Sequence, residues 1–229
     1  ILLNKSDLAD ARLNQEWESF FKEKGYFVQP LNAKTGAGIK NIQALVQESC
    51  KEKIERDRKR GIINRPVRAM VVGIPNVGKS TFINSFAGKA CAKTGNKPGV
   101  TKGKQWIRFN KNLELLDTPG ILWPKFEDQK IGERLALIGS INDEILHVDE
   151  LAVALIRNLK NSYLDLLEKR YDITIDEDAY DTLKRIAIAR KCLQKGELPD
   201  VDRASSMLLE DFRSGKLGRI TLERPEEWK

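Results

Sequence analysis

Two short polar motifs stand in this 229-residue chain in an order that restricts its fold. The first, Asn4-Lys5-Ser6-Asp7, has the pattern N-K-x-D and directly follows the apolar run Ile1-Leu2-Leu3. The second, residues 73–80, reads G-I-P-N-V-G-K-S and fits the phosphate-loop pattern G-x-x-x-x-G-K-S. In a GTP-binding domain of ordinary chain order the phosphate loop comes first, and the guanine-reading N-K-x-D motif comes late. The reversed order predicts a circularly permuted domain.

The phosphate loop has the flanks that its chemistry requires. The apolar residues 69–72 predict a buried strand before it, and residues 81–87 predict a helix after it. Backbone N–H groups of such a loop surround the phosphate oxygens, Lys79 adds a positive charge, and Ser80 offers a hydroxyl to Mg²⁺. We therefore expect one continuous segment to bind the phosphates: Asn76, Val77, Gly78, Lys79, Ser80 and Thr81.

A third motif, Asp117-Thr118-Pro119-Gly120, ends the apolar run at residues 113–116. Asp117 is thereby predicted at the carboxyl edge of a strand, where ligands bind in open α/β sheets. Its carboxylate can hold Mg²⁺, and the Gly120 N–H can meet the γ-phosphate. Thr101 lies between the two phosphate motifs, where a switch threonine belongs, and we expect it on Mg²⁺ when a triphosphate is bound. The predicted catalytic residues are Lys79 and Thr101.

The N-K-x-D motif predicts a site for guanine. The Asp7 carboxylate can accept two hydrogen bonds, from guanine N1–H and from the 2-amino group, which adenine does not supply. Asn4 is expected to tie the base-binding loops together, and the Lys5 stem to lie flat on the base. A further base-reading motif follows, Asn32-Ala33-Lys34, in which the Ala33 N–H is expected to donate to guanine O6. Asn32 replaces the usual serine, a conservative change for a turn residue.

A tandem pair of GTPase domains is the alternative explanation of the motif order. In that arrangement the first domain's guanine motifs precede the second domain's phosphate loop, and another N-K-x-D must follow Gly120. Residues 121–229 contain no such motif. We therefore prefer the permuted domain.

The positive charge of the chain is concentrated in its first half. Residues 1–120 carry a net charge of +11 and residues 121–229 a net charge of −4. Between Arg58 and Leu113 there are thirteen Lys and Arg residues and no acidic residue. A solvated basic surface is one interpretation. We favour a footprint for an RNA backbone, because solvated surfaces normally mix charges of both signs. The candidate RNA contacts flank Thr101: Lys93, Lys97, Lys102, Lys104 and Arg108.

The chain is expected to divide at about residue 125. Residues 1–125 form the permuted α/β domain, with these predicted elements: a helix over 10–24, a strand over 26–28, a helix over 39–54, and a hairpin of 105–109 with 113–116. Residues 126–229 show helical apolar spacing, as at Val201, Ala204 and Leu208, and predict a small helical domain. We expect this domain to contact RNA or the ribosome. The single histidine, His147, is interpreted as structural.

The cysteine positions and the lengths of the apolar runs exclude two classes of protein, namely disulfide-bonded proteins and membrane proteins. Cys50, Cys91 and Cys192 are scattered without a metal-binding or disulfide pattern, which suits a reducing compartment. No apolar run approaches the length of a membrane span, and no signal peptide pattern opens the chain. We expect a cytoplasmic protein with no membrane or disulfide partner.

The motif runs at 73–80 and 115–124 resemble those of the ribosome biogenesis GTPase A (RbgA/YlqF) family of circularly permuted GTPases, and the likeness spans most of the chain. It implies a P-loop NTPase domain, a Rossmann-like three-layer α/β fold, followed by a small all-helical domain. It also implies a bacterial GTP-hydrolysing factor acting late in assembly of the large ribosomal subunit. The expected partners are GTP, GDP, the subunit and its rRNA. Permuted GTPases of the small subunit are less similar, since they carry a zinc-binding cysteine cluster.

The source of catalysis is less defined by the sequence. Ile121 occupies the position at which many GTPases carry a glutamine that orients the attacking water. The resemblance implies a group with a hydrophobic residue there, in which an asparagine at the position of Asn76 helps to hold K⁺ against the phosphates. Intrinsic turnover is then expected to be slow, about 10⁻⁴ to 10⁻² per second. The alternative, which Ile121 favours, is an RNA-binding module whose nucleotide gates affinity with negligible turnover.

The motif order also predicts an incomplete sheet. In the fold that the chain resembles, one strand and one helix lie between the third motif and the N-K-x-D strand. Permutation puts both upstream of Ile1, so we expect the natural protein to have such a segment, in which family members carry a histidine. Without it, we expect a gap between the strands of Leu2 and Val71, whose edges would otherwise be paired.

The guanine assignment can be tested by substituting Asp7→Asn. The asparagine amide donates to the 2-oxygen of xanthine, whereas the carboxylate requires the 2-amino donor of guanine. We expect GTP to bind more weakly to this variant and xanthosine triphosphate more tightly, as measured by fluorescence titration. Unchanged GTP affinity would exclude residues 4–7 from the base site.

Overall fold

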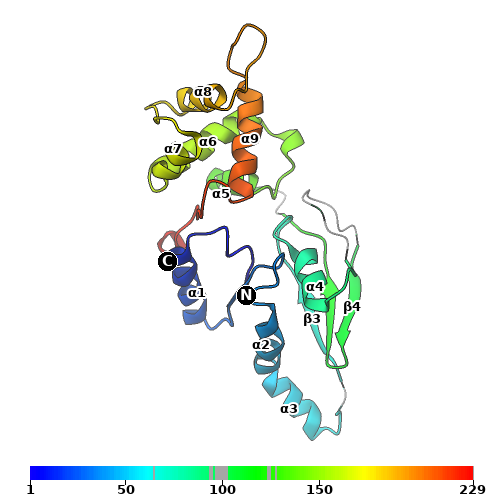
Figure 1. Cartoon of the computed structure of the whole chain (residues 1–229). Coiled ribbons are helices and arrows are strands. Elements are labelled where there is room, and N and C mark those ends of the chain that lie inside the picture. Colours follow the sequence, from blue (N-terminus) through cyan, green and yellow to red (C-terminus); the bar gives the residue numbers. More distant parts are fainter. Residues whose placement is uncertain (64, 93–94, 96–102, 123–124, 127, 229) are drawn as a thin grey trace. The chain divides into compact units, whose positions relative to one another are not determined.

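The computed structural model of the chain describes residues 1–63, 65–92, 95, 103–122, 125–126 and 128–228. It contains two compact units, Ile1–Trp123 together with Arg224–Lys229, and Pro124–Glu223 (Figure 1). The sequence-based division at residue 125 placed the C-terminal tail in the helical domain. In the structure this tail belongs to the first unit, because η3 (Pro225–Trp228) packs against α1 (Ala11–Glu23).

The described strands of the first unit form two sheets. β1 (Leu2–Leu3) pairs in parallel with β2 (Gln29–Pro30). β5 (Leu113–Asp117) lies between β3 (Val67–Val71), which is parallel to it, and β4 (Gln105–Asn110), which is antiparallel. Among the described residues β1 and β3 are not hydrogen-bonded neighbours, which agrees with the expected gap between Leu2 and Val71. The register pairs Val71 with Asp117, so the strands that carry two phosphate motifs end side by side.

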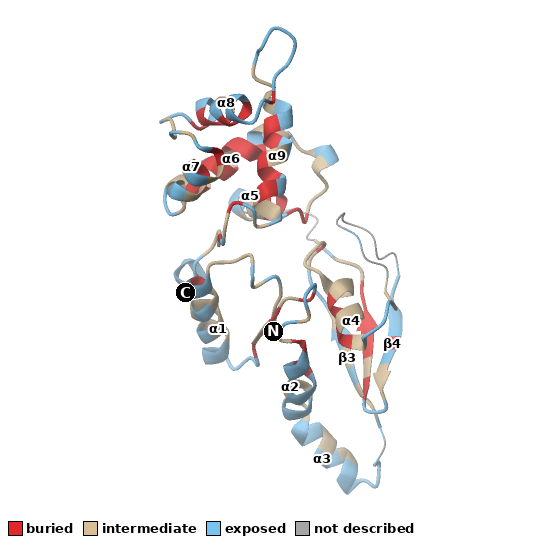
Figure 2. Ribbon diagram, viewed as in Figure 1, coloured by how far each residue is buried: buried red, intermediate tan, exposed pale blue. Residues whose placement is uncertain are grey.

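One face of the three-stranded sheet is covered by helices. Alternate residues of β5, Leu113 and Leu115, are buried against α4 (Lys79–Ala87). The Phe86 ring stacks on Phe109 of β4 with centroids 4.1 Å apart. Residues that follow β2 join the same core, together with η1 (Ile39–Asn41) and α2 (Ile42–Ser49). Figure 2 shows the buried part of α4 turned toward the sheet. This core ties the helix of the phosphate loop to the segment that follows β2.

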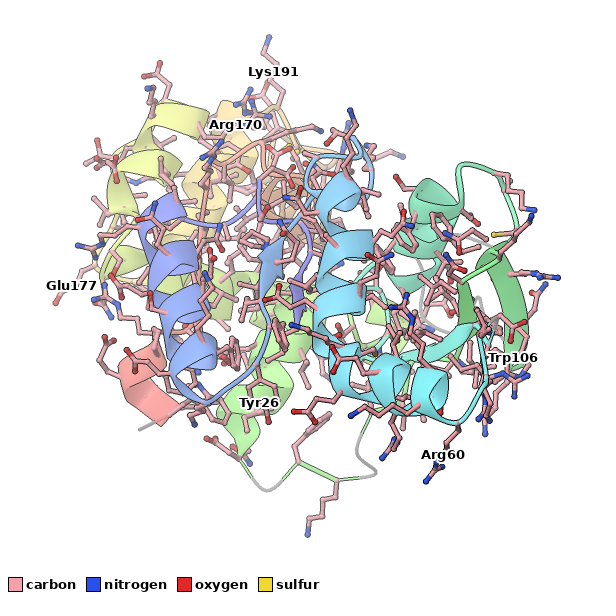
Figure 3. All side chains as sticks on the ribbon, turned by 90° about the horizontal axis from the view of Figure 1, so that it is seen from below. Tyr26, Arg60, Trp106, Arg170, Glu177 and Lys191 are labelled. Carbon is pink, nitrogen blue, oxygen red and sulfur yellow. The ribbon has the colours of Figure 1, made fainter. Side chains whose placement is uncertain are left out.

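Two predicted elements of the first unit differ in the structure. The strand predicted at 26–28 is displaced to β2, since Gly25 (φ +83°) ends α1 and pairing with β1 begins where Gln29 N–H donates to Ile1 O. Tyr26 is instead 54% exposed (Figure 3). The helix predicted over 39–54 is divided into η1, α2 and α3 (Lys51–Lys59), because the Cys50 backbone is not helical (φ −103°, ψ 8°). The predicted first helix and the hairpin are confirmed.

The second unit is a bundle of helices, as the apolar spacing predicts. Its central helix α6 (Val148–Lys160) buries six residues and packs against α8 and α9. His147 lies at the N-cap of α6. The run at 219–222, which reads as a strand by composition, is irregular. The other helices are α5 (Gln129–Leu137), η2 (Asp143–Ile145), α7 (Leu164–Tyr171), α8 (Ala179–Ala189) and α9 (Val201–Arg213).

Polar contacts fix the helices of this unit in place. The guanidinium of Arg213 donates to the carbonyls of Ala136 and Leu137 at the end of α5 (2.8 Å each) and pairs with Asp143. Asp211, 3% exposed, accepts from Arg170 Nε (2.9 Å) and from the Tyr171 hydroxyl (3.2 Å). Burial and the Asp211 carboxylate raise the pKa of Tyr171. Among the described residues, none of the helices is both long and apolar enough to cross a bilayer.

Candidate nucleotide-binding site

The phosphate loop connects β3 to α4 in a conformation suited to anions. Asn76 (φ +60°) and Gly78 (φ +90°) turn the backbone into the left-handed region. The first intrahelical bond of α4 runs from Phe82 N–H to Gly78 O, so residues 79–81 form the N-terminal end of the helix. The N-terminal end of a helix attracts phosphate, because its backbone N–H groups and the helix dipole favour negative charge. Lys79 Nζ folds back over the loop and donates to Gly73 O (3.0 Å) and Ile74 O (2.9 Å).

Ser80 and Asp117 meet at the edge where β3 and β5 end. Ser80 Oγ lies 3.3 Å from Asp117 Oδ2, and Thr118 Oγ1 donates to Val71 O (2.7 Å). Asp117 is 2% exposed, and its Oδ1 accepts no hydrogen bond within the part of the chain that the structure describes. A buried carboxylate oxygen beside a hydroxyl is a donor set that Mg²⁺ prefers. These two residues fit a magnesium ion shared with bound phosphates.

Burial shifts the two charged groups of this edge in opposite directions. It raises the pKa of Asp117, against the opposing effects of the Ser80 hydrogen bond, the Lys79 charge and the Thr118 backbone. It lowers the pKa of Lys79, against the opposing charge of Asp117. Each charged form is therefore penalised by lost hydration. A cation beside Asp117 and an anion beside Lys79 would offset those penalties.

The guanine motif contacts the phosphate loop directly. Asn4 Nδ2 donates to Val77 O (2.8 Å), and Asn4 Oδ1 accepts from Ala33 N–H (3.0 Å). Lys5, whose φ is +56°, extends its ammonium to Asn76 O (2.9 Å). Asn4 therefore joins the segment of residues 32–34 to the phosphate loop, and its role beside a bound base stays a prediction. Asp7 and Lys34 are both exposed on the loops that Asn4 joins.

The Ala33 N–H, which the sequence predicts to donate to guanine O6, donates to Asn4 Oδ1 in the structure (3.0 Å). Ala33 is 3% exposed and packs in the core beside α4. Its contact with guanine stays a prediction.

The third motif lies against the phosphate loop. A Cβ added to Gly120 would stand 2.6 Å from the backbone N and Cα of Pro75 and 3.0 Å from Lys79 Nζ. Only glycine allows this approach, which sets the Gly120 backbone beside the ammonium that faces the phosphates. Ile121, at the usual glutamine position, is 74% exposed, and its side chain cannot hydrogen-bond a water.

Several of the residues predicted to bind magnesium or RNA are not part of the contacts described above. Thr101, Lys93, Lys97 and Lys102 lie outside the described residues. Lys104 and Arg108 are exposed; Lys104 directly precedes β4, and Arg108 lies in the middle of it. Arg108 stands opposite Glu114 in the sheet register, and Glu114 pairs with Arg68 across the same face (3.0 Å). Trp106 projects from this face of β4 (Figure 3) and is 53% exposed.

Asn84 is a positioning residue that the sequence reading missed. Its Oδ1 accepts from Cys91 N–H (2.9 Å) and Ala92 N–H (2.7 Å), and its Nδ2 donates to Ala92 O (2.8 Å). These bonds fasten the chain that leaves α4 to the helix of the phosphate loop. Asparagine is a poor residue for a helix interior. Its presence between Ile83 and Ser85 was the available signal.

Comparisons with known proteins agree with this geometry. Residues 68–180 match a family model described as 50S ribosome-binding GTPase. The chain is 48% identical to ribosome biogenesis GTPase A of Bacillus cereus, covering all of this chain and 77% of that protein. It is 31% identical to the Thermotoga maritima protein of the same name, over 99% of this chain and 76% of that one.

Two solved structures are similar to the model over almost its whole length. A GDP-bound structure described as TM YlqF has a TM-score of 0.66 at 28% identity, covering 99% of this chain and 83% of that one. A GNP-bound YlqF from T. maritima has a TM-score of 0.64 at the same identity and covers 99% of this chain and 81% of that one.

Proposed function

The chain belongs to the ribosome biogenesis GTPase A family, and from that premise we propose that it assists assembly of the large (50S) ribosomal subunit in the cytoplasm by binding and hydrolysing GTP. We propose that its affinity for the subunit and its rRNA changes with the bound nucleotide. The observation that supports this most is the Asn4 amide, which bonds Ala33 N–H and Val77 O and so joins the base-reading and phosphate-binding segments.

The residues divide the work of holding the nucleotide. The Asp7 carboxylate reads guanine, and the N–H groups of residues 79–81, with the Lys79 ammonium, bind the phosphates. Ser80 and Asp117 hold Mg²⁺, which supplies positive charge to the phosphate oxygens when bound. We assign Thr101 to the same ion, from its sequence position. Gly120, beside Lys79 Nζ, offers its N–H to the γ-phosphate.

Hydrolysis is proposed to be slow until the subunit binds. Ile121 is exposed and apolar, so this chain has no side chain at that position to orient the attacking water. We expect intrinsic turnover of about 10⁻⁴ to 10⁻² per second, the range of GTPases without an activating partner. The alternative function, an RNA-binding module with negligible turnover, is favoured by the same residue.

Phosphate release measured with and without purified large subunits separates these two functions. We expect slow release from the protein alone and acceleration of at least about tenfold with subunits, since a partner supplies transition-state contacts. Lys79→Ala, which removes the phosphate-facing ammonium, is the control and should abolish release in both conditions. Release that stays at the background of this control with subunits present would favour the gated RNA-binding module.

Asn76 is proposed to help hold a K⁺ ion against the phosphates. Its backbone is turned by a positive φ, and its carbonyl is bonded to Lys5, which holds the residue at the rim of the phosphate loop. We expect faster phosphate release in K⁺ than in Na⁺ at equal ionic strength, and no difference between the salts for Asn76→Ala. Equal rates in both salts for the unaltered protein would exclude this role.

The basic residues near β4 are proposed to contact rRNA, and the helical unit to provide a further contact. Each neutralised phosphate contributes about −0.9 to −0.7 to the slope of log affinity against log salt. Replacing Lys104→Gln and Arg108→Gln should therefore flatten the slope of subunit binding by about one to two units. Lys22→Gln, on α1 and paired with Glu18, is the control. An unchanged slope in the double variant would assign the contact to other residues.

A further inference from the structure

We propose that Asn32 is a positioning residue that sets the base-reading segment against the phosphate loop, acting through Ala33 and Asn4. The inference rests on the GTP-binding function proposed above. It concerns the residue at which this chain departs from the usual Ser-Ala-Lys motif.

Asn32 organises the turn that follows β2 with four hydrogen bonds. Its side-chain Oδ1 accepts from Lys34 N–H (2.9 Å) and from Thr35 N–H (3.1 Å). Its backbone N–H donates to Ala37 O (3.0 Å), and its backbone O accepts from Gly36 N–H (2.9 Å). An asparagine oxygen that accepts from the second and third following N–H groups makes an Asx turn. The Asn32 side chain therefore orders the turn that begins at this residue.

The far end of the turn is fixed by a close backbone approach. Gly38 has φ +80°, and a Cβ there would lie 2.5 Å from Pro30 O. The segment is therefore held at both ends, by Gly38 against β2 and by the Asn32 side chain. Lys34 and Thr35, at its tip, are exposed. The Asn32 oxygen bonds the N–H groups of both of these residues, so it orders the backbone of the tip together with the backbone bonds of the turn.

The conformation of the turn affects the phosphate loop through Asn4. The turn directs the N–H of buried Ala33 to Asn4 Oδ1 (3.0 Å), while Asn4 Nδ2 donates to Val77 O (2.8 Å). A planar amide bonded at both of its ends has one orientation. If the Ala33 N–H moves, Asn4 Oδ1 loses its donor, and the hydrogen bond from Asn4 Nδ2 to Val77 O weakens. Asn32 and Val77, which share no direct contact in this scheme, are coupled through two residues.

This arrangement predicts how loss of the Asn32 side-chain oxygen changes the affinity for nucleotides. The base loop and the phosphate loop contact parts common to GDP and GTP, so the affinity for both should fall by the same factor. The KM for GTP should therefore rise together with the dissociation constant for GDP.

Titration with fluorescent GDP, and with GTP in a turnover assay, tests the inference on the full chain. Asn32→Ala removes the acceptor of two hydrogen bonds, and we expect GDP to bind about tenfold more weakly. Asn32→Asp and Asn32→Ser keep an oxygen for the turn, and should remain within about threefold of the unaltered protein. Thermal unfolding of each variant separates a binding loss from a folding loss.

Thr35→Ala is the matched control in the same turn. Among the described residues its Oγ1 accepts one long bond, from Ala37 N–H (3.4 Å), and is not bonded to Asn4, so GDP affinity should be unchanged. Equal weakening in Thr35→Ala and Asn32→Ala would show general loosening of the loop and overturn the inference.

A double-mutant cycle with Asn4→Ala provides the decisive comparison. If Asn32 acts through Asn4, the two losses of GDP affinity are less than additive, whereas independent residues give additive losses. Additive losses, or unchanged GDP affinity in Asn32→Ala, would overturn the inference and leave the proposed function in place. Failure of the unaltered protein to bind GDP would instead refute the proposed function.

Discussion

The side-chain amide of Asn4 is the contact on which the nucleotide site depends. It lies 73 residues before its acceptor, Val77, and in the described residues the sheets that carry the two partners are not hydrogen-bonded to each other. A polar bridge alone contributes little net stability. Here it acts beside an apolar core in which Leu31 and Ala33 pack with Ile83 of α4. The core brings the two motifs to the same place, and the amide gives them one relative orientation.

The edge proposed to hold magnesium has a different physical basis. Burial raises the pKa of Asp117 and lowers that of Lys79, so the charged form of each group is penalised by lost hydration. A cation beside Asp117 and an anion beside Lys79 would offset those penalties. The same property makes Asp117 Oδ1 the clearest sign of a metal position among the described groups.

Permutation changes the order of these parts along the chain. The parallel pairing of β3 with β5 puts the ends of both strands at one edge, which is where the phosphate motifs need to be. β1 and its Asn4 reach the same edge from the start of the chain. Because each motif depends on the end of its own strand and on the turn after it, the position of the chain break is of little consequence for the chemistry.

The sequence by itself determined the local elements and the identity of the motifs. The phosphate loop, the hairpin of β4 and β5, and the apolar stripe of α9 follow from glycine positions and side-chain periodicity, which act over a few residues. A link from Asn4 to the second base-reading segment was also expected from the N-K-x-D motif, whereas its bond to Val77 was not. Only the tertiary structure decided that β2 begins at Gln29 and that the Ala33 amide turns to Asn4. It likewise decided that Asn32 and Asn84 order neighbouring backbone. Those outcomes depend on which hydrogen-bond donors and acceptors are brought together by segments far apart in the sequence. A short strand or a polar turn has too few periodic residues for the sequence to show which segment it pairs with.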